Sequence, residues 1–85
     1  MISVHAFPSD AGESRLGLSV SKKVGNAVVR NGVKRRLREI FRSHLPGLRG
    51  ERDFVISARP SAAGATYQDL EREFERALKR LGGDA

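Results

Sequence analysis

The feature that most constrains the fold is a change of hydrophobic period along the chain. Apolar and polar residues alternate over residues 2–7 and 15–21, as they do in half-buried strands. From about 27 to 45 the apolar residues instead recur every three or four positions, which predicts an amphipathic helix. A third alternating segment covers 53–59, and a second helical segment covers 66–81. The order strand, strand, helix, strand, helix predicts an α+β fold.

The segment from Arg15 to Arg59 reads as a βαβ unit. We therefore expect a small two-layer sandwich, in which two helices pack on one face of a sheet of three or more strands. A chain of 85 residues has room for one hydrophobic core, so residues 1–85 are expected to form a single domain. Thr66, followed by Asp69 three residues later, predicts a capping box at the start of the second helix.

The first predicted helix has an apolar side and a basic side. An apolar stripe runs from Val29 to Phe41 and should face the core, and His44 projects onto the same stripe. Beside this stripe, Asn31 and Arg35 lie on one flank. Cations spaced by four residues form a ridge: Arg30, Lys34, Arg38 and Arg42.

Positive charge is concentrated in one part of the chain. The formal net charge is +6, and the segment from Lys22 to Arg42 holds eight basic residues and one acid, Glu39. A merely solvated helix face usually alternates the two signs at helical spacing. A segment whose charges are nearly all positive, in a chain whose other residues have almost no net charge, is typical of a protein that binds a polyanion.

Several classes of protein are excluded by what the sequence lacks. There is no cysteine, no apolar run that could span a membrane, and no signal-peptide pattern, which favours a soluble cytoplasmic protein. His5 and His44 are far apart, and no nucleophile or acid–base pair is indicated by spacing. We therefore expect no catalytic residue and no metal ligand in this chain.

One long string of residues resembles a known family. It runs Leu18-Ser19-Val20-Ser21-Lys22-Lys23-Val24-Gly25-Asn26-Ala27-Val28-Val29-Arg30-Asn31 and continues with Lys34-Arg35 and Arg38-Glu39. Together with Asp53 to Pro60 and the helix from Tyr67 to Leu81, it is similar to the bacterial ribonuclease P protein subunit. Two departures stand out: Gly32 occupies a position where the family usually has Arg, and the family's usual N-terminal helix and first strand are expected to be lacking.

The resemblance implies a function and its partners. The chain would assist a catalytic RNA, which uses Mg²⁺, in removing 5′ leaders from tRNA precursors. The partners would be ribonuclease P RNA and tRNA precursors, with no membrane and no obligate protein partner. The resemblance also implies a left-handed βαβ crossover, against the usual right-handed rule. The implied RNA-binding residues are Lys22, Lys23, Arg30, Asn31, Lys34, Arg35, Arg38 and Arg42.

A second implied surface would bind the single-stranded leader. Ser19 and Ser21 belong to the matching strand, and their side of the strand is small and hydroxylated. His5 and Phe7 are the aromatic residues on the outward side of the first strand, where bases could stack.

The residues alone leave three alternatives open. The same basic helix could belong to a DNA-binding module, although Val28 and Val29 at its start are poor readers of base edges. It could serve a general RNA-binding module without enzymatic role. It could also lie on an anionic lipid surface, provided that its apolar stripe were free.

Overall fold

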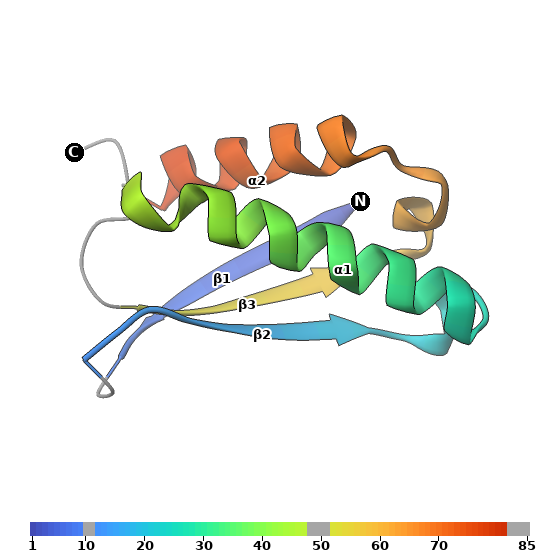
Figure 1. The fold of residues 1–85 in the computed structure, drawn as a ribbon, viewed down its shortest axis with the longest axis horizontal. Helices are drawn as coiled ribbons and strands as arrows, with labels where there is room; N and C mark the ends of the chain where they lie inside the picture. Colours follow the sequence, from blue (N-terminus) through green and yellow to red (C-terminus); the bar gives the residue numbers. More distant parts are fainter. Residues whose placement is uncertain (10–11, 48–51, 82–85) are drawn as a thin grey trace.

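In the computed structural model, two helices cover one face of a three-stranded sheet (Figure 1). The structure describes residues 1–9, 12–47 and 52–81. Helix α1 spans Ala27–His44 and helix α2 spans Tyr67–Arg80. The predicted α+β fold with two helices on a sheet is confirmed. None of the helices in this described part is long and apolar enough to cross a membrane.

The sheet has its last strand in the middle. Strands β1 (Ile2–Pro8) and β2 (Arg15–Val20) both pair with β3 (Arg52–Ala58), which gives the order β1-β3-β2. β3 is antiparallel to β1 and parallel to β2, so β2, α1 and β3 form the predicted βαβ unit. Phe54 and Ile56 of β3 are almost completely buried, as expected for a central strand.

The two helices share the inward face of the sheet. α1 packs mainly over β2 and α2 over β1, and the helices also contact each other (Figure 1). Phe41 of α1 meets the ring of Phe54 edge-on at 5.6 Å and that of Phe74 at 6.5 Å, which joins both helices to the sheet. The largest fully buried side chains are Val33, Leu37, Ile40, Phe54, Ile56, Leu70 and Phe74.

Both helices begin with a side-chain cap. Asn26 accepts a hydrogen bond from the backbone N–H of Val29 at 3.0 Å. The predicted capping box at Thr66 is present, because its side chain accepts from the Asp69 N–H while the Asp69 carboxylate accepts from the Thr66 N–H. The latter bond lowers the pKa of Asp69 below its ordinary value of 3.8.

The structure differs from the predicted boundaries at the ends of elements. β2 ends at Val20, and Lys22–Val24 forms a short 3₁₀ turn where the sequence indicated only a break in pattern. Pro60–Gly64 also forms a 3₁₀ turn, which proline at its first position favours, and Ala62 is buried there. The second helix ends at Arg80, with Leu81 as its cap. Gly82 and Gly83, residues typical of a helix end, lie outside the described residues.

Candidate nucleic-acid interface

The basic side of α1 is positioned by the burial of its apolar side. Leu37 and Ile40 have no exposed surface, so residues on the other sides of the helix must face the solvent or the rim of the sheet. Arg35, Arg38 and Arg42 are exposed. Because the apolar stripe is part of the core, the helix has no free apolar face with which to lie on lipid.

The cations of this surface have no carboxylate partners among the described residues. Three ion pairs occur there: Arg15 with Asp53 at 2.8 Å, the amino terminus with Glu73 at 3.3 Å, and His44 with Glu75 at 3.3 Å. None of them involves a basic residue between Lys22 and Arg42. The positive charge is therefore available to an external anion, as the sequence predicted.

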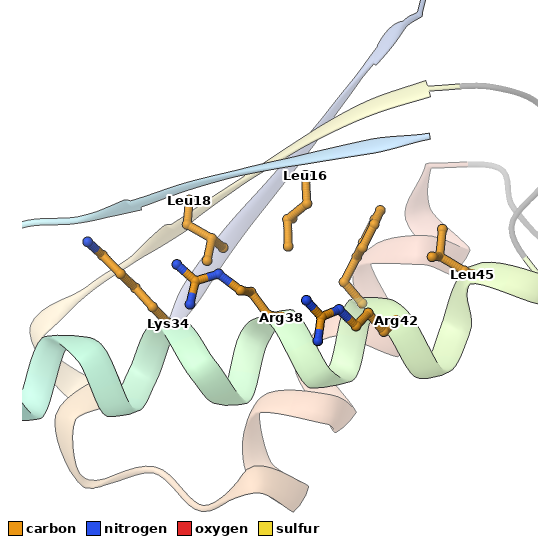
Figure 2. A pocket seen from close by; sticks show the side chains of 7 residues that line it. Leu16, Leu18, Lys34, Arg38, Arg42 and Leu45 are labelled. Atoms are coloured by element: carbon orange, nitrogen blue, oxygen red, sulfur yellow. The ribbon is translucent and has the colours of Figure 1, made fainter. Parts of the chain in front are cut away.

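Part of the ridge lines a groove between α1 and β2. Lys34, Arg38 and Arg42 border it on the helix side, and Leu16 and Leu18 lie opposite on the strand, as Figure 2 shows. The groove has a volume of about 380 Å³. It combines an apolar strip with three cations, a combination that suits a ligand with both a phosphate and a flat apolar part.

The remaining predicted RNA-binding residues do not line this groove, and they differ in exposure. Lys22 and Lys23 are exposed in the turn before α1, and Asn31 is exposed on the helix flank. Arg30 is half-buried, and its Nε is buried without a hydrogen-bond partner among the described residues. Only the terminal nitrogens of Arg30 are therefore placed to meet a ligand.

The predicted leader-binding residues lie on the opposite, uncovered face of the sheet. His5 and Phe7 project from β1, with Phe7 53% exposed, and Ser19 projects from β2. The strands that carry them are separated by β3, which places them on one continuous face about two strand spacings apart. Ser21 is exposed just beyond the end of β2, where its backbone oxygen accepts from Val24.

The one described acid on this uncovered face is neutralised by a neighbour. Asp53 of β3 is paired in register with Phe7 and with Arg15, and the Arg15 guanidinium donates to both carboxylate oxygens at 2.8 Å. This hydrogen bonding holds the pKa of Asp53 below its ordinary value of 3.8. The carboxylate therefore opposes an approaching phosphate less than a lone acid would.

Sequence reasoning missed several residues of both surfaces. Leu16 and Leu18 face α1 and border the groove, because β2 is an edge strand under α1. Arg59 lies exposed beside the uncovered face and donates to the Ser3 hydroxyl at 2.9 Å. These residues could have been located only from the order of the strands in the sheet, and the pattern within each sequence segment does not reveal that order.

β2 belongs to both surfaces at once. Its alternation turns Leu16 and Leu18 towards α1, whereas Gly17 and Ser19 face the uncovered side. The basic groove and the uncovered face are thus the two sides of one edge strand. A single-stranded nucleic acid that bends around this edge could reach both.

Comparisons with known proteins agree on one family. The family model described as "Ribonuclease P" matches residues 1–82. The chain is 48% identical to a ribonuclease P protein component of a Nocardioides species over 84% of its own length and 61% of that relative's length. It is 50% identical to the Thermus brockianus component over 95% of its own length and 47% of the relative's. The chain thus spans about half of the length of these curated relatives.

Solved structures show the same fold. The chain is similar to the Staphylococcus aureus RNase P protein, with a TM-score of 0.83 and 36% identity over 94% of this chain and 73% of that one. It is similar to the Thermotoga maritima RNase P protein, with a TM-score of 0.81 and 29% identity over 93% of this chain and 76% of that one.

Proposed function

Because the chain belongs to the family of bacterial ribonuclease P protein components, we propose that it is the protein subunit of ribonuclease P. In this role it assists a catalytic RNA in the endonucleolytic removal of 5′ leaders from tRNA precursors. Its partners are the ribonuclease P RNA and the precursors, and residues 1–85 act as one RNA-binding domain in the cytoplasm. The observation that carries the proposal is the predominantly basic surface of α1, with Glu39 as its one acid, whose cations have no carboxylate partners among the described residues.

The basic surface would bind the RNA subunit. Lys34, Arg38 and Arg42 at the groove, with Arg35 and Asn31 on the flank, would neutralise phosphates. Arg30 would contribute through its terminal nitrogens, and Lys22 and Lys23 would extend the surface past the start of the helix. Lower repulsion between phosphates lets two RNA molecules approach each other closely.

The chain itself would supply no catalytic group. The residues that line the basic groove include no carboxylate, whereas Mg²⁺ prefers oxygen ligands. We therefore assign the Mg²⁺ ions and the cutting step to the RNA subunit. The contribution of the protein is to position substrate and catalyst and to reduce the Mg²⁺ concentration that they need.

The uncovered sheet face would hold the leader. Its small and hydroxylated residues, such as Ser19, let an extended strand come close, and Phe7 offers an exposed ring for stacking. His5 lies between them along the face, and Ser21 extends it beyond the end of β2. Replacement of Phe7 with Ala should weaken binding of a precursor about 5- to 150-fold, in line with about 1–3 kcal/mol per stacked base. Binding of a mature tRNA without a leader is the control and should not change.

The decisive experiment is reconstitution with a bacterial ribonuclease P RNA. At an Mg²⁺ concentration too low for the RNA alone, the added chain should restore cleavage at the 5′ end of the mature tRNA sequence. A variant with Lys34, Arg38 and Arg42 replaced by Ala should lose this rescue. A matched variant with Arg72, Arg76 and Arg80 of α2 replaced by Ala has the same change in charge and should retain it.

Two outcomes would contradict the proposal. One is a folded wild-type chain that gives no rescue at any protein concentration. The other is equal competition by duplex DNA for the bound RNA, which would favour a DNA-binding module instead.

A further inference from the structure

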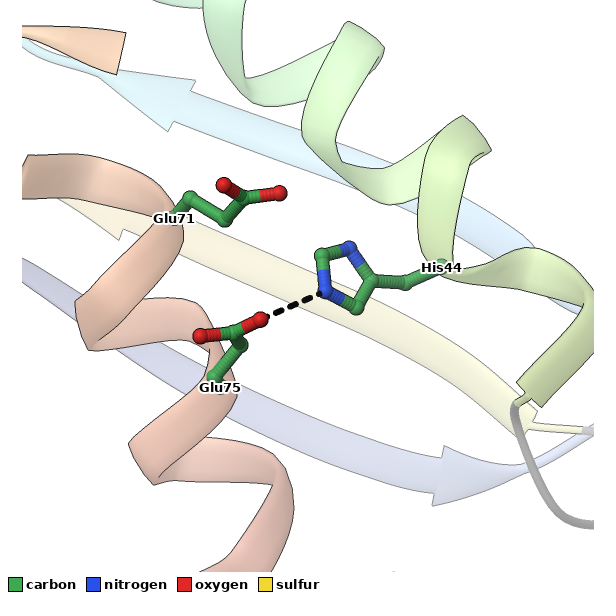
Figure 3. A group of neighbouring side chains, drawn as sticks. All are labelled: His44, Glu71 and Glu75. Atoms are coloured by element: carbon green, nitrogen blue, oxygen red, sulfur yellow. Dashed lines mark hydrogen bonds and ion pairs between the residues drawn. The ribbon is translucent and has the colours of Figure 1, made fainter. Parts of the chain in front are cut away.

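A second group of chemically active side chains lies away from the basic groove, where the end of α1 meets α2 (Figure 3). His44 comes from the last turn of α1, and Glu71 and Glu75 stand four positions apart on one side of α2. One ligand atom from each of these residues lies within 4.8 Å of the other two. The sequence did not indicate this group, because the packing of the helices brings together residues that are far apart in the chain.

The contacts of His44 determine which ring nitrogen faces the glutamates. Its Nδ1 lies 2.9 Å from the backbone oxygen of Ile40. A carbonyl oxygen only accepts, and the Ser43 hydroxyl, 3.2 Å from Nδ1, donates its own proton to the same Ile40 oxygen at 2.9 Å, so both neighbours favour a proton on Nδ1. The ring also packs edge-on against Phe74, with centroids 5.3 Å apart, which fixes its orientation. Nε2 then points at Oε2 of Glu75 at 3.3 Å.

This arrangement is the one that metal-binding histidines usually have. One ring nitrogen donates to a backbone carbonyl, and the other is directed at the ion. With Nδ1 protonated, a neutral ring turns a lone pair towards the Glu75 carboxylate, which is also an acceptor. The contact is favourable only with a positive charge between the two, carried either by a proton or by a metal ion.

Glu71 distinguishes these two possibilities. Its carboxylate is half-buried beside that of Glu75, and the structure gives it no hydrogen bond or ion pair with any described residue. A simple ion pair between His44 and Glu75 makes no use of this second carboxylate. A cation bound by all three residues does.

We propose that His44, Glu71 and Glu75 bind one Zn²⁺ or a chemically similar divalent transition-metal ion. An imidazole nitrogen with two carboxylates suits such ions, whereas Mg²⁺ and Ca²⁺ favour oxygen ligands alone. Three protein ligands leave a position for water, as is common for Zn²⁺. The ion would fasten the end of the basic helix to α2, and it would stabilise the folded chain because the ligands come together only in the fold.

The test is calorimetric titration of the whole chain with Zn²⁺, starting from metal-free protein. We expect one saturable ion per chain and a higher melting temperature in its presence. Glu71→Gln should weaken Zn²⁺ binding by about tenfold or more and leave the melting temperature of the metal-free protein unchanged. His44→Gln should weaken binding at least as much. Glu39→Gln makes the same change at an exposed glutamate of α1 outside the group, and it should have no effect.

A spectroscopic readout locates the ion. Bound Mn²⁺ should broaden the ring signals of His44 in NMR spectra far more than those of His5, which lies on the uncovered sheet face. The proposal is overturned if no saturable binding occurs, or if the ion broadens His5 instead. It is also overturned if Glu71→Gln binds Zn²⁺ as tightly as the wild type, since His44 and Glu75 would then form an ordinary ion pair.

Discussion

α1 and α2 pack side by side on the same face of the sheet, and each buries one apolar side. Their outward sides differ. α1 carries six basic residues and one acid, whereas α2 carries four of each sign. On α2, acids serve the fold: Asp69 completes the capping box, and Glu73 accepts from the backbone N–H of Ile2 at 3.1 Å. On α1, none of the six cations forms an ion pair with a described residue.

The difference indicates that the positive charges of α1 serve binding and slightly destabilise the helix. The ridge from Arg30 to Arg42 contains three successive like-charge pairs at i,i+4 spacing. Each such pair destabilises an exposed helix by about 0.2–0.5 kcal/mol. The total, about 1 kcal/mol, is small beside the burial of the apolar stripe, so the fold tolerates it.

The largest expected effect tests whether the apolar side of α1 holds the fold. Leu37 has no exposed surface, so Leu37→Ala should lower the free energy of unfolding by about 2–5 kcal/mol in urea denaturation. Arg38→Ala, at the next position on the exposed side, should change it by less than about 0.5 kcal/mol. Equal losses of unfolding free energy in the two variants would show that the buried and exposed sides of α1 do not differ in their contribution to the fold.

The next effect tests whether the two helices differ in RNA binding. Lys34→Ala combined with Arg38→Ala should weaken binding to ribonuclease P RNA about 10- to 100-fold, without loss of stability. If each residue contacts one phosphate, the slope of log affinity against log salt should become less steep by about 1.5–2. Arg72→Ala combined with Arg76→Ala removes the same charge from α2 and should leave affinity and slope nearly unchanged. Equal weakening by both pairs would point to net charge instead of a defined surface.

A smaller effect concerns the glycine inside α1, for which α2 has no counterpart. Gly32→Ala should stabilise the protein by about 0.5–1 kcal/mol, because glycine is a poor helix former. A Cβ there would meet its nearest atom, Arg36 Nη1, at 3.6 Å, an ordinary contact. Gly25→Ala should be destabilising, since that residue has a φ of +155° and its Cβ would lie 3.0 Å from the Val29 side chain. Thermal unfolding of the two variants should give opposite signs.

The smallest effect concerns the charges of α2 and is expected in acid. The pKa of Asp69 is lowered in the folded state, so its ionised form stabilises the fold above its unfolded pKa. This contribution is lost as the pH falls from about 4 through the lower folded pKa. Stability measured from pH 6 to pH 2 should therefore fall less steeply in Asp69→Asn than in the wild type, while RNA binding at pH 7 stays the same. If the stability of both proteins falls equally steeply towards low pH, the carboxylate charge has no role in the cap.

Most of the fold could be predicted from local pattern. The alternation of apolar residues located all three strands to within one or two residues, and Thr66 located the start of the second helix. These signals are local because strand alternation, helical period and caps each depend on residues within a few positions of one another.

What could not be predicted depends on distant residues. The register between β2 and β3 cannot be read from local pattern, so the sequence could not show that Leu16 and Leu18 border a groove with Lys34. For the same reason it placed His44 on the apolar stripe without its partner Glu75. Binding residues could be proposed only because their charges are crowded into one segment.

The central position of β3 has a consequence for the order in which the chain acquires structure. Within the described residues, β1 and β2 each pair only with β3, so a nascent chain that ends before residue 52 holds two strands without their pairing partner. Arg15 pairs with Asp53, and Ile2 pairs with Ala58. Each of these pairings closes a loop that is long for so short a polypeptide. Assembly should thus be all-or-none and late, with the sheet closing only after translation has passed its third strand.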